Sequence, residues 1–197
     1  MTYNGSMSVP DTSADEYIAS LVQAGDTTAF GALVERYEQK LLRYGTKFLA
    51  SPDDVQDIVQ EVFLSVYQNI KSFDVTQRFS PWIYRIAHNA FVNGLKRQQK
   101  RPFLSIDFDT LVAHVPYEDP ADIEREQREM RTMIDAGLSK IDPKYREVLI
   151  LYYLEDLSYK EIADVLQVPT GTVGIRIKRA KAALTKAYKS LNITYGA

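Results

Sequence analysis

Apolar residues recur at every third or fourth position along most of the chain, and no stretch keeps the strict alternation of a β-strand for long. The pattern is clearest from Phe30 to Phe48 and from Val55 to Ile70, where the apolar positions form a single stripe along a helix. The pattern therefore predicts an all-α fold whose core is built from such stripes.

Four helix starts are marked by a capping residue that is followed directly by proline. The capping side chain accepts a hydrogen bond from a free amide of the first turn, and proline at the first helical position lacks only a donor that the helix leaves unused. A capping box, in which serine is followed three residues later by glutamate, marks a fifth start. These starts are Ser51-Pro52, Ser80-Pro81, Asp119-Pro120, Asp142-Pro143 and the box from Ser158 to Glu161.

The stretch from Pro102 to Asp119 lacks sustained helical periodicity and mixes Pro, Asp, His and isolated apolar residues. We interpret it as a flexible linker between two small helical domains. The predicted boundaries are a first domain at 12–101, a linker at 102–118 and a second domain at 119–193.

Composition excludes several kinds of chemistry. The 197 residues include no cysteine, and the two histidines, His88 and His114, lie far apart in the sequence. Disulfides, thiolate metal sites and cysteine nucleophiles are excluded, and metalloenzyme chemistry is disfavoured, so we expect no cofactor and no bound metal. No signal peptide and no run of about 18 apolar residues is visible, which favours a cytoplasmic protein.

The net charge of -2 conceals an uneven distribution. Residues 71–101 carry seven Lys or Arg and one Asp or Glu, and residues 136–197 carry ten and six. Residues 1–70 and 102–135 are acidic instead, each with a net charge of -6. Two basic blocks separated by an acidic one favour two anion-binding surfaces, with acidic surfaces for a protein partner, although solvated helix faces give the same counts.

The basic block near the C-terminus has the pattern of a helix-turn-helix. A short helix at 159–166 and a three-residue turn lead into a longer second helix. Arg176, Lys178 and Arg179 lie off the apolar stripe of that helix, and residues 174–191 hold six Lys or Arg and no Asp or Glu. This arrangement suits a helix that reads the major groove and contacts phosphates. An exposed helix whose cations only aid solubility is the alternative.

Residues 79–91 are rich in aromatic side chains and run directly into a group of cations. Flat rings can stack on unpaired bases while cations follow the phosphate backbone, as in proteins that bind single strands. The alternative is that the aromatic residues belong to the core, but Trp82 and Tyr84 cannot both share the narrow apolar stripe of that helix.

Three segments, taken together and in this order, resemble the bacterial extracytoplasmic-function (ECF) sigma factors of the sigma-70 family. They are DDVQDIVQEVF at 53–63, FSPWIYRIAHN at 79–89, and LSYKEIA at 157–163 with PTGTV at 169–173. Each motif alone is weak, whereas the three in order are specific, and the resemblance covers about residues 15–190. It implies that the first domain is sigma-70 region 2, which binds core RNA polymerase and opens the minus-ten element. The second domain would be region 4, which reads the minus-thirty-five element.

The resemblance also implies roles for individual residues. Phe73 and Asn89 match positions that help to hold a base flipped out of the non-template strand, where stacking and amide hydrogen bonds offset the cost of unpairing. The residues matched to core-polymerase binding are Asp57, Gln60 and Glu61. Those matched to minus-ten DNA and melting are Phe73, Phe79, Trp82, Tyr84, Asn89, Asn93, Lys96, Arg97, Lys100 and Arg101. Those matched to minus-thirty-five DNA are Thr172, Ile175, Arg176, Lys178, Arg179 and Lys181.

Four positions depart from the family pattern. Asn93 stands where aspartate is usual, and His88 stands where a small or aliphatic residue is usual, and both bear on the minus-ten sequence preference. Gly174 and Ile175 replace a basic or polar pair. Either one phosphate or base contact is lost there, or Ile175 contacts a thymine methyl group instead.

The sequence thus predicts an alternative RNA polymerase sigma factor, which is a non-catalytic specificity subunit. The resemblance implies bacterial core RNA polymerase, promoter DNA and an anti-sigma factor as partners, with no small-molecule substrate. One alternative is a helix-turn-helix repressor or activator that binds duplex DNA without joining the polymerase, but it leaves the aromatic cluster around Trp82 and the polar face around Asp57 without a role. The other is an enzyme, but no convergent set of catalytic groups appears.

Overall fold

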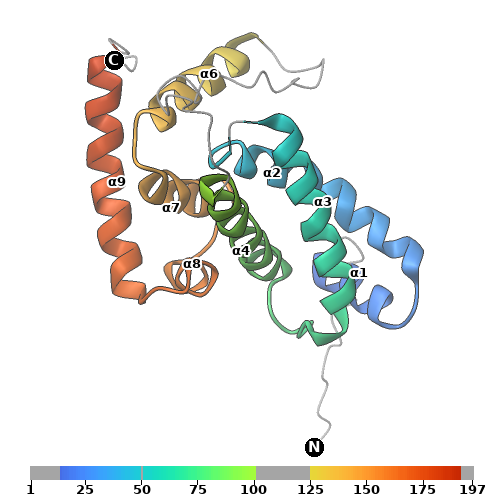
Figure 1. The fold of residues 1–197 in the computed structure, drawn as a ribbon. Coiled ribbons are helices and arrows are strands. Elements are labelled where there is room, and N and C mark those ends of the chain that lie inside the picture. Colours follow the sequence, from blue (N-terminus) through green and yellow to red (C-terminus); the bar gives the residue numbers. More distant parts are fainter. Residues whose placement is uncertain (1–13, 50, 101–124, 192–197) are drawn as a thin grey trace, which may run out of the picture.

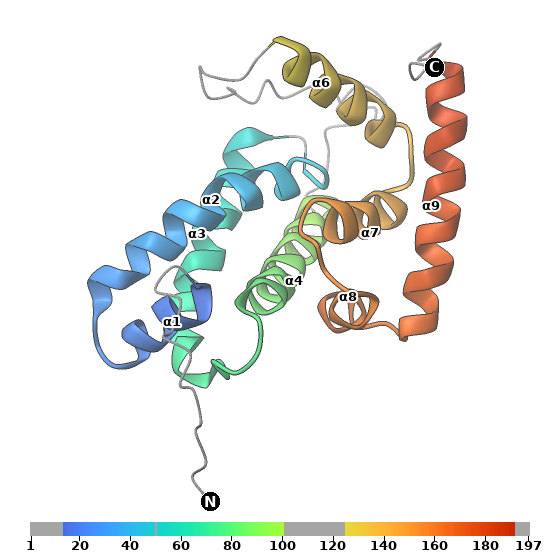
Figure 2. The same cartoon turned by 180° about the vertical axis from the view of Figure 1, so that it is seen from behind.

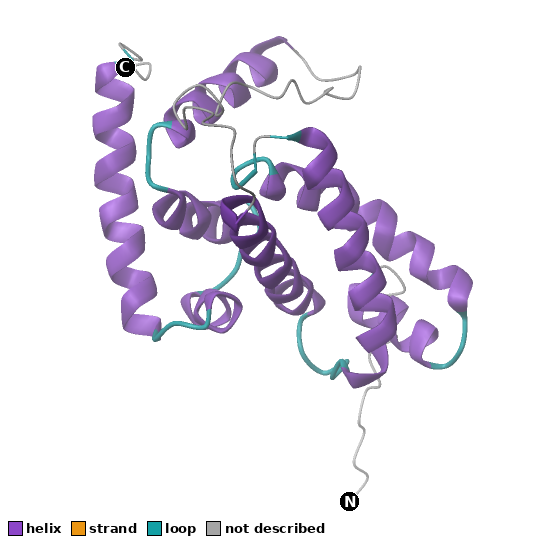
Figure 3. Ribbon diagram, viewed as in Figure 1, coloured by secondary structure: helices purple, strands orange, loops and turns teal. Residues whose placement is uncertain are grey.

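The computed structural model describes residues 14–49, 51–100 and 125–191, and these residues form helices and no strand (Figures 1 and 3). This confirms the predicted all-α fold. The N-terminal half, residues 14–100, comprises α1 (Asp15–Gln23), the 3-10 turn η1 (Thr27–Ala29), α2 (Phe30–Gly45), α3 (Pro52–Asn69), the 3-10 turn η2 (Ile70–Ser72) and α4 (Phe79–Lys100). The C-terminal half, residues 125–191, comprises α6 (Arg125–Ser139), α7 (Pro143–Tyr153), α8 (Tyr159–Leu166) and α9 (Thr170–Ser190).

The two predicted apolar stripes form the centre of the N-terminal half, where α3 packs against both α2 and α4. The buried residues of these stripes are Leu33, Tyr37, Leu41 and Tyr44 on α2 and Val55, Ile58, Val59, Val62 and Val66 on α3. The three helices approach closely at Gly45, where an added Cβ atom would lie 2.4 Å from the ring of Phe91 and 2.7 Å from Val55. Glycine is therefore the residue that fits where α2 ends.

Three of the predicted helix starts are confirmed by their capping contacts. The Ser51 hydroxyl accepts a hydrogen bond from the amide of Asp54 (3.3 Å), and an Asp142 carboxylate oxygen accepts one from the amide of Lys144 (3.0 Å). The capping box at the start of α8 has both of its reciprocal hydrogen bonds. Local sequence is sufficient to position these helices because each cap lies within three residues of the amide that it serves.

The predicted start at Ser80-Pro81 is wrong, because α4 already begins at Phe79. The amide of Phe79 donates a hydrogen bond to a carboxylate oxygen of Glu16 on α1 (2.7 Å). A distant side chain satisfies the first amide of α4, so serine is not needed as the cap. The predicted start at Asp119-Pro120 and the predicted linker 102–118 lie outside the described residues.

The C-terminal half contains the predicted helix-turn-helix in α8 and α9. The backbone of Gln167 adopts the left-handed conformation (φ 53°) and ends α8, and α9 begins three residues later. α9 packs against α6, α7 and α8. The three-residue turn expected from the sequence is therefore confirmed.

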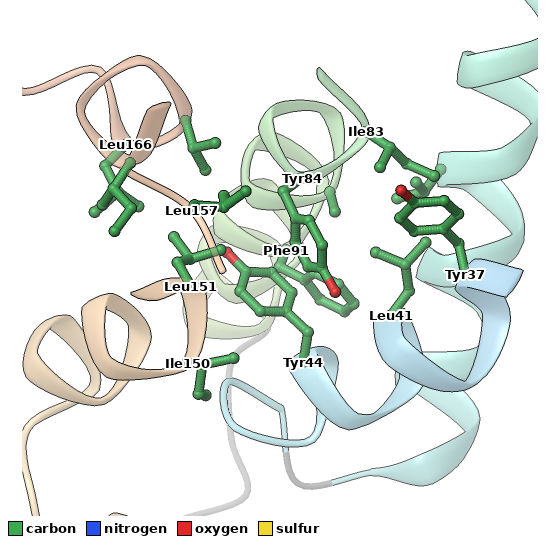
Figure 4. Packing of buried hydrophobic residues seen from close by; sticks show 14 of the residues in the cluster. Tyr37, Leu41, Tyr44, Ile83, Tyr84, Phe91, Ile150, Leu151, Leu157 and Leu166 are labelled. Atoms are coloured by element: carbon green, nitrogen blue, oxygen red, sulfur yellow. The ribbon is translucent and has the colours of Figure 1, made fainter. Parts of the chain in front are cut away.

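The two halves pack against each other. α8 packs against α4, and both views of the fold show α4 lying between the remaining N-terminal helices and the C-terminal half (Figures 1 and 2). Buried side chains from the two halves meet in one cluster, with Tyr44, Tyr84 and Phe91 on one side and Leu151 and Leu157 on the other (Figure 4). The contact between the halves is therefore part of the hydrophobic core.

Candidate nucleic-acid and partner interfaces

α9, the second helix of the helix-turn-helix, buries its apolar stripe and exposes most of its matched residues. Val173, Ile177 and Ala180 are buried against the rest of the C-terminal half. Of the residues matched to the minus-thirty-five element, Ile175, Lys178, Arg179 and Lys181 are exposed, and Thr172 and Arg176 are half-buried. The helix thus presents guanidinium, ammonium and methyl groups to solvent, which are the groups that read base edges and phosphates.

Lys181 also has a partner within the protein. Its Nζ lies 5.3 Å from the centre of the Tyr153 ring, as in a cation–π contact. A hydrogen bond with Tyr153 raises the pKa of Lys181. Tyr153 of α7 thus holds the side chain of Lys181 in place.

Gly174 lies next to the exposed residues of α9 and faces Tyr159 of α8. An added Cβ atom would lie 3.6 Å from the Tyr159 ring, which is an ordinary van der Waals contact. The glycine therefore is not required by packing. Ile175 beside it is 56% exposed, so its apolar side chain is available for a methyl group of DNA.

Glu161 has two functions at the start of α8. Its side chain accepts a hydrogen bond from the amide of Ser158 (2.7 Å) and contacts the Arg78 guanidinium of the N-terminal half (3.1 Å). Partial burial raises the pKa of Glu161, but the hydrogen bonds with Ser158 and the Arg78 charge outweigh this, so that the pKa lies below its ordinary value of 4.5. The same carboxylate thus caps the helix-turn-helix and contacts the other half of the chain.

α4 carries a row of exposed polar residues on one face. Asn89, Asn93 and Lys96 are exposed and spaced by four and three residues, which places them along one side of the helix. Arg85 is exposed four residues before Asn89 and lies in the same row. Arg85 was not among the residues matched from the sequence, although its helical spacing to Asn89 marks it. The structure does not describe the side chain of Lys100 or any part of Arg101.

The matched aromatic residues at the start of α4 pack against one another. Ring centres of Phe73 and Phe79 are 5.3 Å apart, and that of Trp82 lies 5.0 Å from Phe73 and 5.6 Å from Phe79. Phe73 and Phe79 are buried, and Trp82 is half-buried. Gln23 fixes the preceding loop by donating hydrogen bonds to the carbonyl oxygens of Ile70 (2.7 Å) and Phe73 (2.8 Å). In this arrangement only Trp82 offers part of its ring to a nucleic acid.

The structure does not bring Phe73 and Asn89 together as one base pocket. Phe73 packs on Trp82, and Asn89 lies seven residues further along α4, which is about 10 Å of helix. Tyr84 is fully buried on another side of α4, with its ring centre 5.2 Å from that of Tyr44. In this arrangement Phe73, Phe79 and Tyr84 are therefore core residues.

The residues matched to polymerase binding lie on the solvent side of α3. Asp57, Gln60 and Glu61 are all exposed. Glu61 forms an ion pair with Arg97 of α4 (3.1 Å), and both residues line a cavity of about 200 Å³. Both side chains of this pair are more than half exposed, so it contributes little to stability, about 0–1 kcal/mol. Because the pair is weak and all three residues are exposed, these groups can form new polar contacts with a partner.

An apolar groove of about 700 Å³ lies between α6, α7 and α9 and was not expected from the sequence. Ile134, Leu149, Leu184 and Lys189 are among the residues that line it. These residues come from three helices that are separate in the sequence, so no local pattern marks them. Within the described residues, no cluster of His, Asp or Glu could hold a metal ion, and no helix is long and apolar enough to cross a membrane.

Comparisons with known proteins match both halves. Residues 33–101 match Sigma-70 region 2, and residues 131–184 match Sigma-70, region 4. The ECF RNA polymerase sigma factor SigW of Bacillus subtilis (strain 168) is 32% identical over 179 residues, which span 86% of this chain and 94% of SigW.

Two solved structures share the fold. CnrH in complex with the cytosolic domain of CnrY is 26% identical, with a TM-score of 0.64 over 89% of this chain and 97% of CnrH. The sigma factor RpoE in complex with the anti-sigma factor NepR from Bartonella quintana is 18% identical, with a TM-score of 0.65 over 81% of this chain and 96% of RpoE.

These matches follow the order of the motifs along the chain and cover both halves. The identity to SigW extends over nearly all of that protein. The resemblance predicted from the sequence is therefore confirmed. The chain belongs to the sigma-70 family and is an alternative sigma factor of the extracytoplasmic-function type.

Proposed function

We propose that the two halves of this sigma factor divide promoter recognition between them. The first domain, 12–101, binds core RNA polymerase and opens the minus-ten element, and the second, 119–193, reads the minus-thirty-five element. The observation that carries the proposal is the exposure of Lys178, Arg179 and Lys181 on α9. A capped helix-turn-helix whose cations point outward can place its second helix in a major groove.

At the minus-thirty-five element, Arg179 and Lys178 are the principal contacts. A guanidinium can bond to two acceptors of a guanine edge, whereas an ammonium contacts phosphate without reading sequence. Both side chains are exposed. Ile175 replaces a polar contact with an apolar one, which favours a thymine at that position.

At the minus-ten element, the exposed row of α4 supplies the contacts. Asn89 and Asn93 have both a donor and an acceptor for the edge of an unpaired base, and Lys96 and Arg85 supply charge for the strand backbone. Trp82, at the start of the helix, is the exposed part of the aromatic cluster. Phe73, Phe79 and Tyr84 support this surface from below, and a direct contact with DNA requires that they first be uncovered.

On α3, which packs beside α4, Asp57, Gln60 and Glu61 bind the polymerase. Their charge and amide groups suit a basic surface on the partner. We propose that the polymerase performs the chemistry and that this chain is not an enzyme. We further propose that it works in the cytoplasm and that an anti-sigma factor covers these surfaces, since RpoE of Bartonella quintana, which has the same fold, is complexed with one.

Run-off transcription with purified core polymerase tests the proposal. Promoter-specific transcripts are expected with core plus this chain and not with either alone. The matched control replaces Leu64, an exposed residue of α3 outside the matched set, with Ala and is expected to retain full activity. DNA binding by the chain without any polymerase-dependent transcript would favour the repressor or activator alternative.

A further inference from the structure

Two carboxylates of the C-terminal half are buried against the N-terminal half. We propose that Glu147, set against Tyr44 and His88, forms a latch that holds the free chain closed and unable to occupy both promoter elements, and that the partly paired Glu155 limits the strength of this latch. This inference rests on the proposed function, which assigns one element to each half.

Glu147 is the centre of the latch. It is 5% exposed, and its Oε1 atom accepts a hydrogen bond from the Tyr44 hydroxyl and lies 2.6 Å from Nδ1 of His88. A carboxylate has no donor, so Nδ1 of His88 carries a proton in this contact. Burial and the Glu147 charge both raise the pKa of Tyr44, which keeps its hydroxyl protonated as a donor. The unusual histidine noted in the sequence thus contacts the other half of the chain.

Glu155, which follows α7, is the second carboxylate and is incompletely paired. Its side chain is 5% exposed, and the nearest ammonium, that of Lys40, is 3.9 Å away. The Tyr84 hydroxyl faces it: burial raises the pKa of Tyr84, and the charge of Glu155 raises it further. The Tyr84 hydroxyl and Oε2 of Glu155 face each other, but within the described residues neither atom has a partner at the distance and angle of a well-formed hydrogen bond. A buried charge without full pairing opposes closure, so the closed arrangement can be opened.

Other polar contacts join the halves around the latch. Arg146 of α7 donates a hydrogen bond to the carbonyl oxygen of Lys47 (2.6 Å), and Nζ of Lys47 pairs with Asp135 of α6 (2.5 Å). At the far end of the interface, Arg78 contacts Glu161 (3.1 Å). The halves are therefore held at several separate points, which gives one defined closed arrangement.

In the closed arrangement the two DNA-facing helices, α4 and α9, lie too close together to contact both promoter elements. The names of the two elements place them about 25 base pairs apart, which is about 85 Å of duplex at 3.4 Å per base pair. α8 packs against both α4 and α9, so only two interhelical spacings of about 10 Å each separate the two DNA-facing helices.

Closure therefore lowers the apparent affinity of the chain for polymerase and promoter by the fraction of chains that are open. Weakening the latch raises this fraction. A latch variant is then expected to act at lower concentration than the wild type, whereas a variant that only damages the fold acts at higher concentration.

Fluorescence energy transfer measures the closure directly. The chain has no cysteine, so Gln77→Cys and Asp164→Cys together give two unique labelling sites. Both positions are exposed and lie close to the contact between Arg78 and Glu161. High transfer efficiency is expected for the free chain, and low efficiency once core polymerase and a promoter are bound.

Tyr44→Phe removes the hydroxyl from the latch and keeps the ring. Loss of a hydrogen bond to a buried charge should raise the ratio of open to closed chains about tenfold or more, and lower the concentration for half-maximal run-off transcription by the same factor. The matched control is Tyr37→Phe, which removes a hydroxyl that bonds to Asp15 (2.6 Å) within the N-terminal half. It should leave both readouts unchanged. Circular dichroism establishes that each variant is folded.

Arg78→Ala tests the same inference from the surface, because this side chain is 52% exposed and its loss leaves the core intact. A shift of about twofold to fivefold in the same direction is expected. Low transfer efficiency in the free wild type, or unchanged values in folded Tyr44→Phe and Arg78→Ala variants, would overturn the latch. Absence of promoter-specific transcripts from the wild type would instead overturn the proposed function, while the transfer efficiency of the free chain still reports closure.

Discussion

Alanine substitutions at two glycines test the helix packing, because one is expected to raise the Tm and the other to lower it. Gly174 lies in the interior of α9, where glycine costs about 0.5–1 kcal/mol relative to alanine. An added Cβ atom would meet the Tyr159 ring at an ordinary 3.6 Å. Gly174→Ala is therefore expected to stabilise the protein by about 0.5–1 kcal/mol and to raise Tm by about 1–4 °C.

Gly45→Ala is the matched counterpart. Its Cβ atom would lie 2.4 Å from the Phe91 ring and 2.7 Å from Val55, and both of those side chains are buried. Overpacking of this kind costs about 1–3 kcal/mol, and Tm should fall by several degrees. Thermal unfolding followed by circular dichroism measures both variants. A lower Tm for Gly174→Ala, or an unchanged one for Gly45→Ala, would refute the packing described for these helices.

Three further predictions concern function and pH. Arg179→Ala should weaken binding of the holoenzyme to the minus-thirty-five element by about 1–3 kcal/mol in a filter-binding assay, and wild-type affinity would remove Arg179 from that contact. The double change Asp57→Lys, Glu61→Lys should abolish co-purification with core polymerase while Tm stays nearly constant, since exposed positions change stability by only about 0.5 kcal/mol; retained binding contradicts the polymerase face. The pKa of Glu161 is lowered in the folded chain, so its stabilising effect is present above its ordinary pKa of 4.5 and is lost as the pH falls through the lower folded value. Glu161→Gln should therefore have a lower Tm than the wild type at pH 7, and the difference between the two Tm values should shrink below pH 4.5. A Tm difference that does not change with pH would contradict this prediction.

The sequence predicted those features whose determinants lie within a few residues of each other. The caps at Ser51, Asp142 and Ser158, the apolar stripes and the short turn before α9 are of this kind. The start of α4 was misplaced because Glu16, more than sixty residues away, satisfies its first amide. Contacts of such separation leave no periodic pattern in the sequence.

In the candidate site, too, features set by nearby residues were predicted and features set by distant residues were not. Exposure of Lys178 and Arg179 followed from helical spacing alone. The burial of Tyr84 did not, because Glu155 of the C-terminal half faces it and the core around it is shared by both halves (Figure 4). A contact made by residues so far away in the chain leaves no periodic pattern around Tyr84 in the sequence.

The division of labour between the halves is tested most directly by footprinting the holoenzyme on a promoter selected from random DNA. Two protected elements about 25 base pairs apart are expected, with thymines that react with permanganate only in the downstream element, because base pairs open there. A single protected element without reactive thymines would contradict the account and identify the chain as a duplex-binding regulator.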